Sequence, residues 1–195
     1  MRFNAFKESV KDLQLFNKGW RGFIYKGSWE GIEVAIKVAR EEEKEYAIRK
    51  EGEILKLLKG YKGFPQLLMA GEDFIVYEFI KGNPIEKLLL SKSQKSLIYL
   101  RVLDLIRVLD TLRINKEELQ RLDKNTLVDE DFEVYLLDFE RGSLNAKKRH
   151  NLSQFLQLLA KEDHISMEKA IELGKRYVKE EEVYDEVEEI IRAFV

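Results

Sequence analysis

The stretch G-I-E-V-A-I-K-V-A-R, residues 31–40, determines how the first half of this chain is expected to fold. It alternates as a β-strand does, and parity puts the larger aliphatic side chains on one face: Val34, Ile36 and Val38. Ala35, Lys37 and Ala39 then lie on the opposite face. In an ordinary half-buried strand this second face would meet water, so Lys37 either reaches solvent or is aimed at a ligand.

Composition limits the classes of protein to consider. The chain has 195 residues, of which 45% are hydrophobic and 36% charged, with a net charge of −2. This predicts one domain, or one domain in two small lobes, with a real core. No apolar run spans a membrane and no signal peptide is recognised, so we expect a cytoplasmic protein. The absence of cysteine excludes disulfides and thiolate metal sites, and the Lys/Glu-rich composition suggests a thermophile.

The chain changes character near residue 83. Five short runs before it are patterned as strands: 13–18, 23–29, 32–39, 66–70 and 73–79. One helix, about 42–59, interrupts them. Beyond residue 83 the pattern is mostly helical, with a helix start at Asn83-Pro84, a buried helix over 96–113 and a hairpin over 125–140. Three helices follow, at about 152–161, 166–179 and 181–194. The fold class is therefore α+β in two lobes, with the cleft between them as the default ligand site.

The surroundings of Lys37 favour a ligand. Gly19 and Gly22 fall in a turn between the two preceding strands, where glycine lets backbone N–H groups approach an anion, although an ordinary hairpin turn explains them equally well. In the helix at 42–59, Glu51 shares the apolar face of Ile48 and Leu55. A carboxylate on a buried face needs a partner, and Lys37 is the natural candidate; otherwise Glu51 reaches solvent at the helix boundary.

From about residue 14 to 140, these motifs resemble the protein-kinase-like superfamily. N-K-G-W-R-G-F-I, 17–24, is similar to a glycine-rich loop, and Val-Ala-Ile-Lys ending at Lys37 to the strand-three motif. Glu51 matches the helix-C glutamate. Asp138-Phe139-Glu140 resembles Asp-Phe-Gly, and Asn125 stands thirteen residues before Asp138, as the two metal ligands of kinases do.

The resemblance implies an ATP site and a division of the chain. Residues 1–82 would form an N-lobe with a five-stranded antiparallel sheet and one helix, and 83–195 a trimmed, mostly helical C-lobe. Asn125 and Asp138 would bind Mg²⁺, and Lys37 would hold phosphates. The residues implied around the nucleotide are Gly19, Gly22, Ile24, Ala35, Lys37, Glu51, Tyr77, Glu78, Ile80 and Leu127. Among these, Tyr77 would be the gatekeeper, the backbone of Glu78 and Ile80 would meet adenine, and Ile24, Ala35 and Leu127 would enclose it.

The catalytic loop departs from the family pattern. In place of His-Arg-Asp the chain has I-N-K-E-E-L-Q-R-L-D-K-N, 114–125. The kinase spacing gives Gln120, which is a poor base. If two residues are inserted, Glu118 replaces the aspartate and could accept a hydroxyl proton, although a solvated charge explains it equally well. Asp123 is a second candidate, but it stands close to Asn125.

The segment after Asp138 lacks a long activation loop and an Ala-Pro-Glu motif. This trimmed form resembles small atypical archaeal predicted serine/threonine kinases and, more distantly, RIO, lipopolysaccharide and tRNA-modification-associated kinases. The basic cluster 147–150 is interpreted as a solvated loop, with an acidic substrate or RNA as the alternative, and His150 and His164 as surface residues.

Two functions are therefore open. The first is an atypical serine/threonine kinase that uses ATP and Mg²⁺, with Lys37, Glu118 and Asp138 as catalytic residues and a protein or small-molecule acceptor. The second is an ATP-binding pseudokinase or ATPase-like regulatory module. Because the net charge is slightly negative, a nucleic-acid partner is not expected. No membrane partner is expected, since the chain has no apolar spanning segment.

Overall fold

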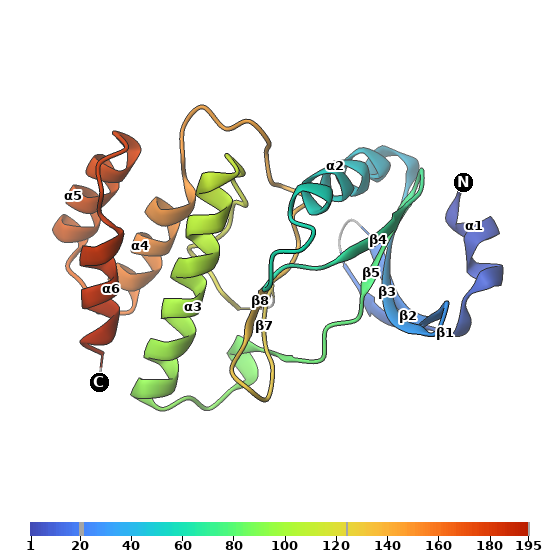
Figure 1. Cartoon of the computed structure of the whole chain (residues 1–195), viewed down its shortest axis with the longest axis horizontal. Coiled ribbons are helices and arrows are strands. Elements are labelled where there is room, and N and C mark those ends of the chain that lie inside the picture. Colours follow the sequence, from blue (N-terminus) through green and yellow to red (C-terminus); the bar gives the residue numbers. More distant parts are fainter. Residues whose placement is uncertain (20–21, 124, 195) are drawn as a thin grey trace. The chain divides into compact units, whose positions relative to one another are not determined.

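A computed structural model describes residues 1–19, 22–123 and 125–194 (Figure 1). Trp20 and Arg21 of the predicted glycine-rich loop, and Lys124, lie outside the described residues. The chain divides into two compact units, and each is described separately. The first is Met1–Lys81 with Leu137–Arg141; the second is Gly82–Leu136 with Gly142–Val195.

The first unit is built on a five-stranded antiparallel sheet in the order β1-β2-β3-β5-β4. Its strands are β1 (Lys11–Lys18), β2 (Gly22–Trp29), β3 (Ile32–Ala39), β4 (Leu67–Ala70) and β5 (Phe74–Glu78). The alternating pattern of 31–40 therefore forms the central strand. This confirms the five strands expected from the sequence, because period-two alternation between turn residues is a local signal.

One face of the sheet packs on the N-terminus of the chain. Val34, Ile36 and Val38 share a core with Phe3 and Phe6. These two phenylalanines lie on α1 (Phe3–Phe6), which is followed by a short 3₁₀ helix, Lys7–Ser9. The sequence interpretation missed α1, because a helix of four residues is too short to show a period. Its spacing nevertheless puts both aromatic rings on the sheet.

The opposite face of the sheet is covered by α2 (Glu45–Leu57). Helical spacing puts its apolar residues on one side, and the buried members are Ile48, Ile54, Leu55 and the following Leu58. Gly52 lies on the same side, where an added Cβ would approach Ile75 Cγ2 to 3.1 Å and Ala70 Cβ to 3.6 Å. The glycine therefore lets α2 lie close to β4 and β5.

The second unit is mostly helical. Its helices are α3 (Lys92–Thr111), α4 (Asn151–Lys161), α5 (Met167–Val178) and α6 (Tyr184–Arg192). A small sheet, β6-β7-β8, completes it, with β7 at Thr126–Val128 and β8 at Val134–Leu136. The long helix, the hairpin and the three C-terminal helices lie where the sequence predicts them. No helix in the described part of the chain is long and apolar enough to cross a membrane.

The predicted helix start at Asn83-Pro84 is wrong. These residues form β6 (Asn83–Pro84) and pair with Val128 and Leu127. A two-residue strand can hold a proline because the missing N–H removes little of so short a ladder. The helix α3 begins later, at Lys92, directly after its N-cap Ser91. The Ser91 hydroxyl accepts from the Gln94 backbone while the Gln94 side chain accepts from Ser91 N–H.

Candidate functional site

Lys37 lies in the middle of β3, opposite Ile24 of β2 and Ile75 of β5. Because directly opposed residues of an antiparallel pair share a face, Ile24 and Ile75 lie on the same side of the sheet as Lys37. This is the side that α2 covers. Only 8% of Lys37 is exposed, so the interpretation of an ordinary solvent-facing lysine does not apply.

The Lys37 ammonium contacts three carboxylates. Its Nζ donates to Glu51 Oε2 at 2.6 Å and to Asp138 Oδ1 at 2.9 Å. Glu140 Oε2 lies 3.4 Å from the same Nζ. The pairing of Lys37 with Glu51 was predicted from helix and strand periodicity, and it is present. The side chains of Glu51, Asp138 and Glu140 are 3%, 27% and 13% exposed, so the cluster is largely shielded from water.

These charges decide the protonation state of Lys37. Burial acts to lower the pKa of its ammonium, but the negative charges of Glu51, Asp138 and Glu140 outweigh burial and hold this pKa well above the usual value. Lys37 is therefore a fixed positive charge at physiological pH. It can attract an anion but cannot serve as a base.

The segment 137–141 brings Asp138 and Glu140 to Lys37. Phe139 is fully buried, with its ring centroid 5.9 Å from that of Phe64, and its backbone N–H donates to Glu51 Oε1 at 3.1 Å. Glu51 therefore holds both Lys37 and this segment. Asp138 has a φ of 65°, a left-handed conformation that Asp tolerates better than most residues. The turn thus does not require a glycine at position 140.

The carboxylates could hold a divalent cation. One oxygen from each of Glu51, Asp138 and Glu140 lies within 4.8 Å of the other two. Oxygen donors of this kind are the ligands that Mg²⁺ prefers. In this structure the Lys37 ammonium already contacts all three carboxylates, and Asp138 is the member of the group that the resemblance implies as a Mg²⁺ ligand.

Glu140 is the residue of this cluster that sequence reasoning missed. In the resemblance to Asp-Phe-Gly it stands only in the place of the glycine, with no role of its own. No local pattern puts it beside Lys37, because β8 ends at Leu136 and Asp138 has a left-handed φ of 65°, so the side-chain alternation of a strand does not apply here.

The predicted adenine-side residues line the same sheet. Tyr77 pairs with Ala35 and both are buried, at 8% and 4% exposure. Burial, the largest influence, raises the pKa of Tyr77, so its hydroxyl stays neutral. The Glu78 N–H donates to Gln66 O at 3.2 Å, so this N–H is already used within the first unit. Ile80 is half-buried just beyond β5.

Of the two glycines of the predicted loop, Gly22 has a steric reason, whereas an added Cβ at Gly19 would make an ordinary contact of 3.5 Å with Gly22 O. Gly19 N–H donates to Gly22 O at 2.8 Å, and a Cβ at Gly22 would lie 2.4 Å from Val38 O. No larger residue therefore fits at Gly22 without moving β3. The part of the loop that would reach a phosphate, Trp20 and Arg21, lies outside the described residues.

Glu118, Asn125 and Leu127 belong to the second unit. Glu117 and Glu118 both have positive φ, 67° and 64°, which is uncommon for glutamate and costs conformational energy. Glu118 Oε1 lies 3.7 Å from Arg121. Asn125 directly precedes β7, and Leu127 on β7 pairs with Tyr135 of β8. The sequence-predicted candidates Gln120 and Asp123 line a cavity of about 430 Å³ with α3 and α4.

The segment 114–119 is held by the first turn of α4. Asn151 Oδ1 accepts from Lys116 N–H at 2.9 Å, and its Nδ2 donates to Ile114 O at 2.7 Å. Gln154 Oε1 accepts from Leu119 N–H at 3.0 Å, while its Nε2 donates to Glu117 Oε2 at 2.6 Å. These bonds maintain the unusual backbone at Glu117 and Glu118. Sequence reasoning missed them, because the partners are 35 to 37 residues apart.

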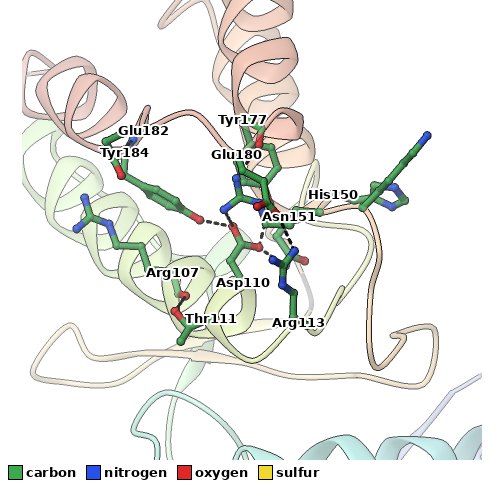
Figure 2. Close-up of polar contacts among 12 residues, drawn as sticks. Arg107, Asp110, Thr111, Arg113, His150, Asn151, Tyr177, Glu180, Glu182 and Tyr184 are labelled. Carbon is green, nitrogen blue, oxygen red and sulfur yellow. Dashed lines mark hydrogen bonds and ion pairs between the residues drawn. The ribbon is translucent and has the colours of Figure 1, made fainter.

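The Asp110 carboxylate holds the Asn151 side chain in its orientation (Figure 2). Its carboxylate accepts from Asn151 Nδ2 and from the Tyr177 hydroxyl, each at 2.9 Å, and from the Tyr184 hydroxyl. Asp110 lies on the helix that the sequence predicts to be buried, over 96–113, and it is only 7% exposed although it is charged. A carboxylate fits this interior because three donors from α4, α5 and α6 surround it.

The prediction of two surface histidines is confirmed for His150, which is exposed, and wrong for His164, which is largely buried. The His164 ring stacks on Phe194 with centroids 3.7 Å apart, and its side chain is 22% exposed. His150 is half-exposed, and its Nδ1 lies 3.4 Å from Glu117 Oε1. Neither is grouped with other histidines in the described residues.

No model of a known protein family matches the chain. Two curated proteins are similar to it. The Bacillus subtilis (strain 168) protein named "Putative serine/threonine-protein kinase YrzF" is 33% identical over 82 residues, which cover 42% of this chain and 38% of that protein. A Dictyostelium discoideum protein named "Probable LIM domain-containing serine/threonine-protein kinase" is 29% identical over 158 residues.

That second match covers 71% of this chain but 16% of the Dictyostelium protein. The chain thus spans less than half the length of either relative. The two similarities support a kinase-like relationship.

Proposed function

We propose that this chain transfers the γ-phosphoryl group of ATP, with Mg²⁺, to a hydroxyl group of a protein or small molecule. In this proposal it is an atypical serine/threonine kinase of the small archaeal type. Residues 1–82 and 83–195 act as the N-lobe and the trimmed C-lobe of one kinase-like domain.

The observation that carries the proposal is the placement of Lys37. A lysine on a rigid central strand, paired with a buried glutamate of the adjacent helix and with Asp138, is the arrangement that phosphoryl transfer uses. A merely structural ion pair would not need a second carboxylate, Asp138, from a segment 101 residues away. The pattern also agrees with the kinase names of the two relatives.

Each residue then has a role in the proposal. Glu51 orients Lys37, whose ammonium contacts phosphate oxygens. Asp138 and Asn125 hold Mg²⁺, which neutralises phosphate charge when bound. Ile24, Ala35 and Leu127 enclose adenine beside Tyr77, and the backbone groups of Glu78 and Ile80 bind its edge. Gly19 and Gly22 keep the loop close to the phosphates.

Glu118 is the proposed base. As the acceptor hydroxyl oxygen attacks the γ-phosphorus, the bond from phosphorus to the ADP oxygen breaks, and the hydroxyl proton passes to the Glu118 carboxylate. The hydrogen bonds from Asn151 and Gln154 to the backbone of 114–119 support this role, because they fix the loop that carries Glu118.

Nucleotide binding is tested by thermal shift with ATP, with and without Mg²⁺. A ligand that binds only the folded state raises the melting temperature. Wild type should show a Mg²⁺-dependent rise, and Lys37→Met should lose most of it while Lys56→Met, an exposed lysine of α2, keeps it. Since Lys37→Met also changes basal stability, the compared quantity is the shift within each variant. No rise in wild type at saturating ATP would refute the nucleotide site.

Chemistry is tested by ADP release in the presence of serine-containing peptides. We expect Glu118→Gln to lower turnover by about a hundredfold or more while the ATP-induced thermal shift is kept. Glu130→Gln, an exposed glutamate in the β7–β8 turn, is the control. Unchanged turnover in Glu118→Gln would show that Glu118 is not the base.

Asp138→Asn should abolish the Mg²⁺-dependent binding of ATP in the thermal-shift measurement.

The second candidate is an ATP-binding regulatory module without transfer activity. It is favoured by the K-E-E-L sequence, 116–119, in place of His-Arg-Asp. A normal ATP-induced shift together with no ADP release from any acceptor would select this function over the kinase.

A further inference from the structure

The outer side of α4 and α5, which pack side by side in the second unit (Figure 1), carries an open groove. Its volume is about 490 Å³. We call it the α4–α5 groove and define it by the residues that the argument uses: Ser153, Met167, Ile171, Gly174, Lys175 and Val178, with Lys179 at its end. The groove residues belong to the second unit, whereas Lys37, Glu51 and Asp138 belong to the first. What we infer from the groove does not depend on the proposed kinase function.

The apolar surface of α5 is wider than the part of it that packs against the rest of the chain. The inward side, Ala170, Leu173 and Tyr177, is buried. A second apolar stripe remains open, because Met167, Ile171 and Val178 are 53%, 51% and 43% exposed. Their spacing of four and seven residues puts them on one side of the helix over about 17 Å, or three turns. Apolar side chains aligned in this way mark a binding surface more often than scattered ones do.

Gly174 lies in the middle of this stripe. Glycine inside a helix costs about 1 kcal/mol relative to alanine. Packing within the chain does not require it, since an added Cβ would meet Ser153 Oγ at 3.7 Å, an ordinary contact. Because glycine has no side chain, nothing projects into the groove at this position, and the backbone of another chain can approach closely. The buried Ser153 hydroxyl beside it has no hydrogen-bond partner among the described residues.

The charges on α5 identify what fits the groove. On the side of α5 away from the groove the cations are paired: Lys169 with Glu172 and Glu186, and Arg176 with the same two carboxylates. Lys175 and Lys179 lie at the groove, one turn apart. Within the described part of the chain, neither pairs with a carboxylate, and no acidic residue lines the groove. The groove therefore presents an apolar floor with a positive edge.

We propose that the α4–α5 groove binds an amphipathic helix of a partner protein, with an apolar ridge and acidic residues along one side. The ridge would lie on the stripe of Met167, Ile171 and Val178 and pass closest at Gly174. The acidic residues, one turn apart, would meet Lys175 and Lys179. This is the helix-in-groove mode of recognition, which needs anchors on one helical side and complementary charge at the edge.

The test uses a fluorescent peptide of about 14 residues with leucines at helical spacing and glutamates beside them, and a matched peptide with lysines in place of the glutamates. Binding to the full chain is measured by fluorescence anisotropy at low ionic strength. The acidic peptide should bind at least about tenfold more tightly than the basic one. Lys175→Glu/Lys179→Glu should reverse this preference, whereas Lys59→Glu/Lys62→Glu, exposed lysines outside the groove, should leave it unchanged.

Gly174→Leu, which fills the floor, should abolish binding of the acidic peptide with an unchanged circular dichroism spectrum. If neither peptide binds, or if the acidic peptide binds equally well to wild type, the charge-reversed variant and Gly174→Leu, the proposal is wrong. A dimer in sedimentation that Ile171→Asp dissociates would overturn it in favour of a second copy of this chain. Because no nucleotide is added, these outcomes do not depend on kinase activity.

Discussion

At the scale of single residues, the charges of the Lys37 cluster cost free energy to bury. Transfer of an ammonium and several carboxylates from water into a shielded site costs several kcal/mol per ion, and only close, hydrogen-bonded pairing offsets it. Glu51 meets this requirement with both oxygens: one accepts from Lys37 and the other from Phe139 N–H. Such a pair does not by itself make the protein more stable than apolar residues would. The proposed phosphate-binding role of Lys37 gives a reason for the pair that stability alone does not.

The Lys37→Met substitution should therefore destabilise the first unit by about 3–5 kcal/mol, because it leaves Glu51 buried without its cation. Lys37→Met/Glu51→Gln should recover part of this loss, since no uncompensated charge remains at position 51. The measurement is urea denaturation at pH 7. Glu53→Gln, an exposed glutamate of the same helix, is the control and should change stability by less than about 0.5 kcal/mol. A double variant no more stable than Lys37→Met would contradict this account.

At the scale of elements, the strands and long helices follow from local patterns, whereas the short elements do not. The period-two alternation of 32–39 is visible without any partner, and so is the buried side of α2. By contrast, α1 and β6 have four and two residues, and each exists because another segment covers it. The helix start predicted at Asn83-Pro84 was wrong, because these two residues are a good start signal on their own and only their pairing with β7 excludes it. The helix predicted over 96–113 is α3, which begins four residues earlier, at Lys92.

The true start of α3 gives a prediction. Ser91→Ala removes the acceptor for Gln94 N–H and should cost about 1 kcal/mol of unfolding free energy. Ser93→Ala is the matched control. Its hydroxyl lies 3.1 Å from the Ser91 hydroxyl and, among the residues that the structure describes, caps no backbone group. Thermal and urea unfolding of both variants provide the comparison. Equal losses in the two variants would mean that the capping box does not stabilise α3.

At the scale of the whole molecule, Asp110 joins all four helices of the second unit. It projects from α3 and accepts from side chains of α4, α5 and α6 (Figure 2). Through Asn151 the same network holds the segment that carries Glu118. The stability of the helical unit and the geometry of the proposed catalytic loop therefore depend on one buried carboxylate.

This network should make stability fall at alkaline pH. Burial, and then the charge of Asp110, raise the pKa of Tyr177 and Tyr184 above their usual value of 10.0. Above pH 10 the unfolded chain loses these protons while the folded chain keeps them, so the free energy of unfolding decreases as pH rises.

Urea denaturation from pH 8 to about 11.5 measures this decrease. Tyr177→Phe/Tyr184→Phe should show a smaller decrease, although it begins from lower stability because Asp110 loses two donors. Tyr46→Phe, at a tyrosine that is 68% exposed, should behave as wild type. A pH dependence in the double variant equal to that of wild type would contradict the role of the two hydroxyls.

The sequence by itself determined the five strands, the longer helices and the position of Glu51 on the apolar side of α2. Each of these depends on side-chain periodicity within one element, and periodicity dictates which side is buried. Only the tertiary structure decided that Glu140 joins Lys37, that Asp110 is buried, that Asn83-Pro84 pairs with β7, and that the outer stripe of α5 stays open. These depend on which distant segment supplies a hydrogen bond, a charge or an apolar cover, and no local pattern specifies that partner.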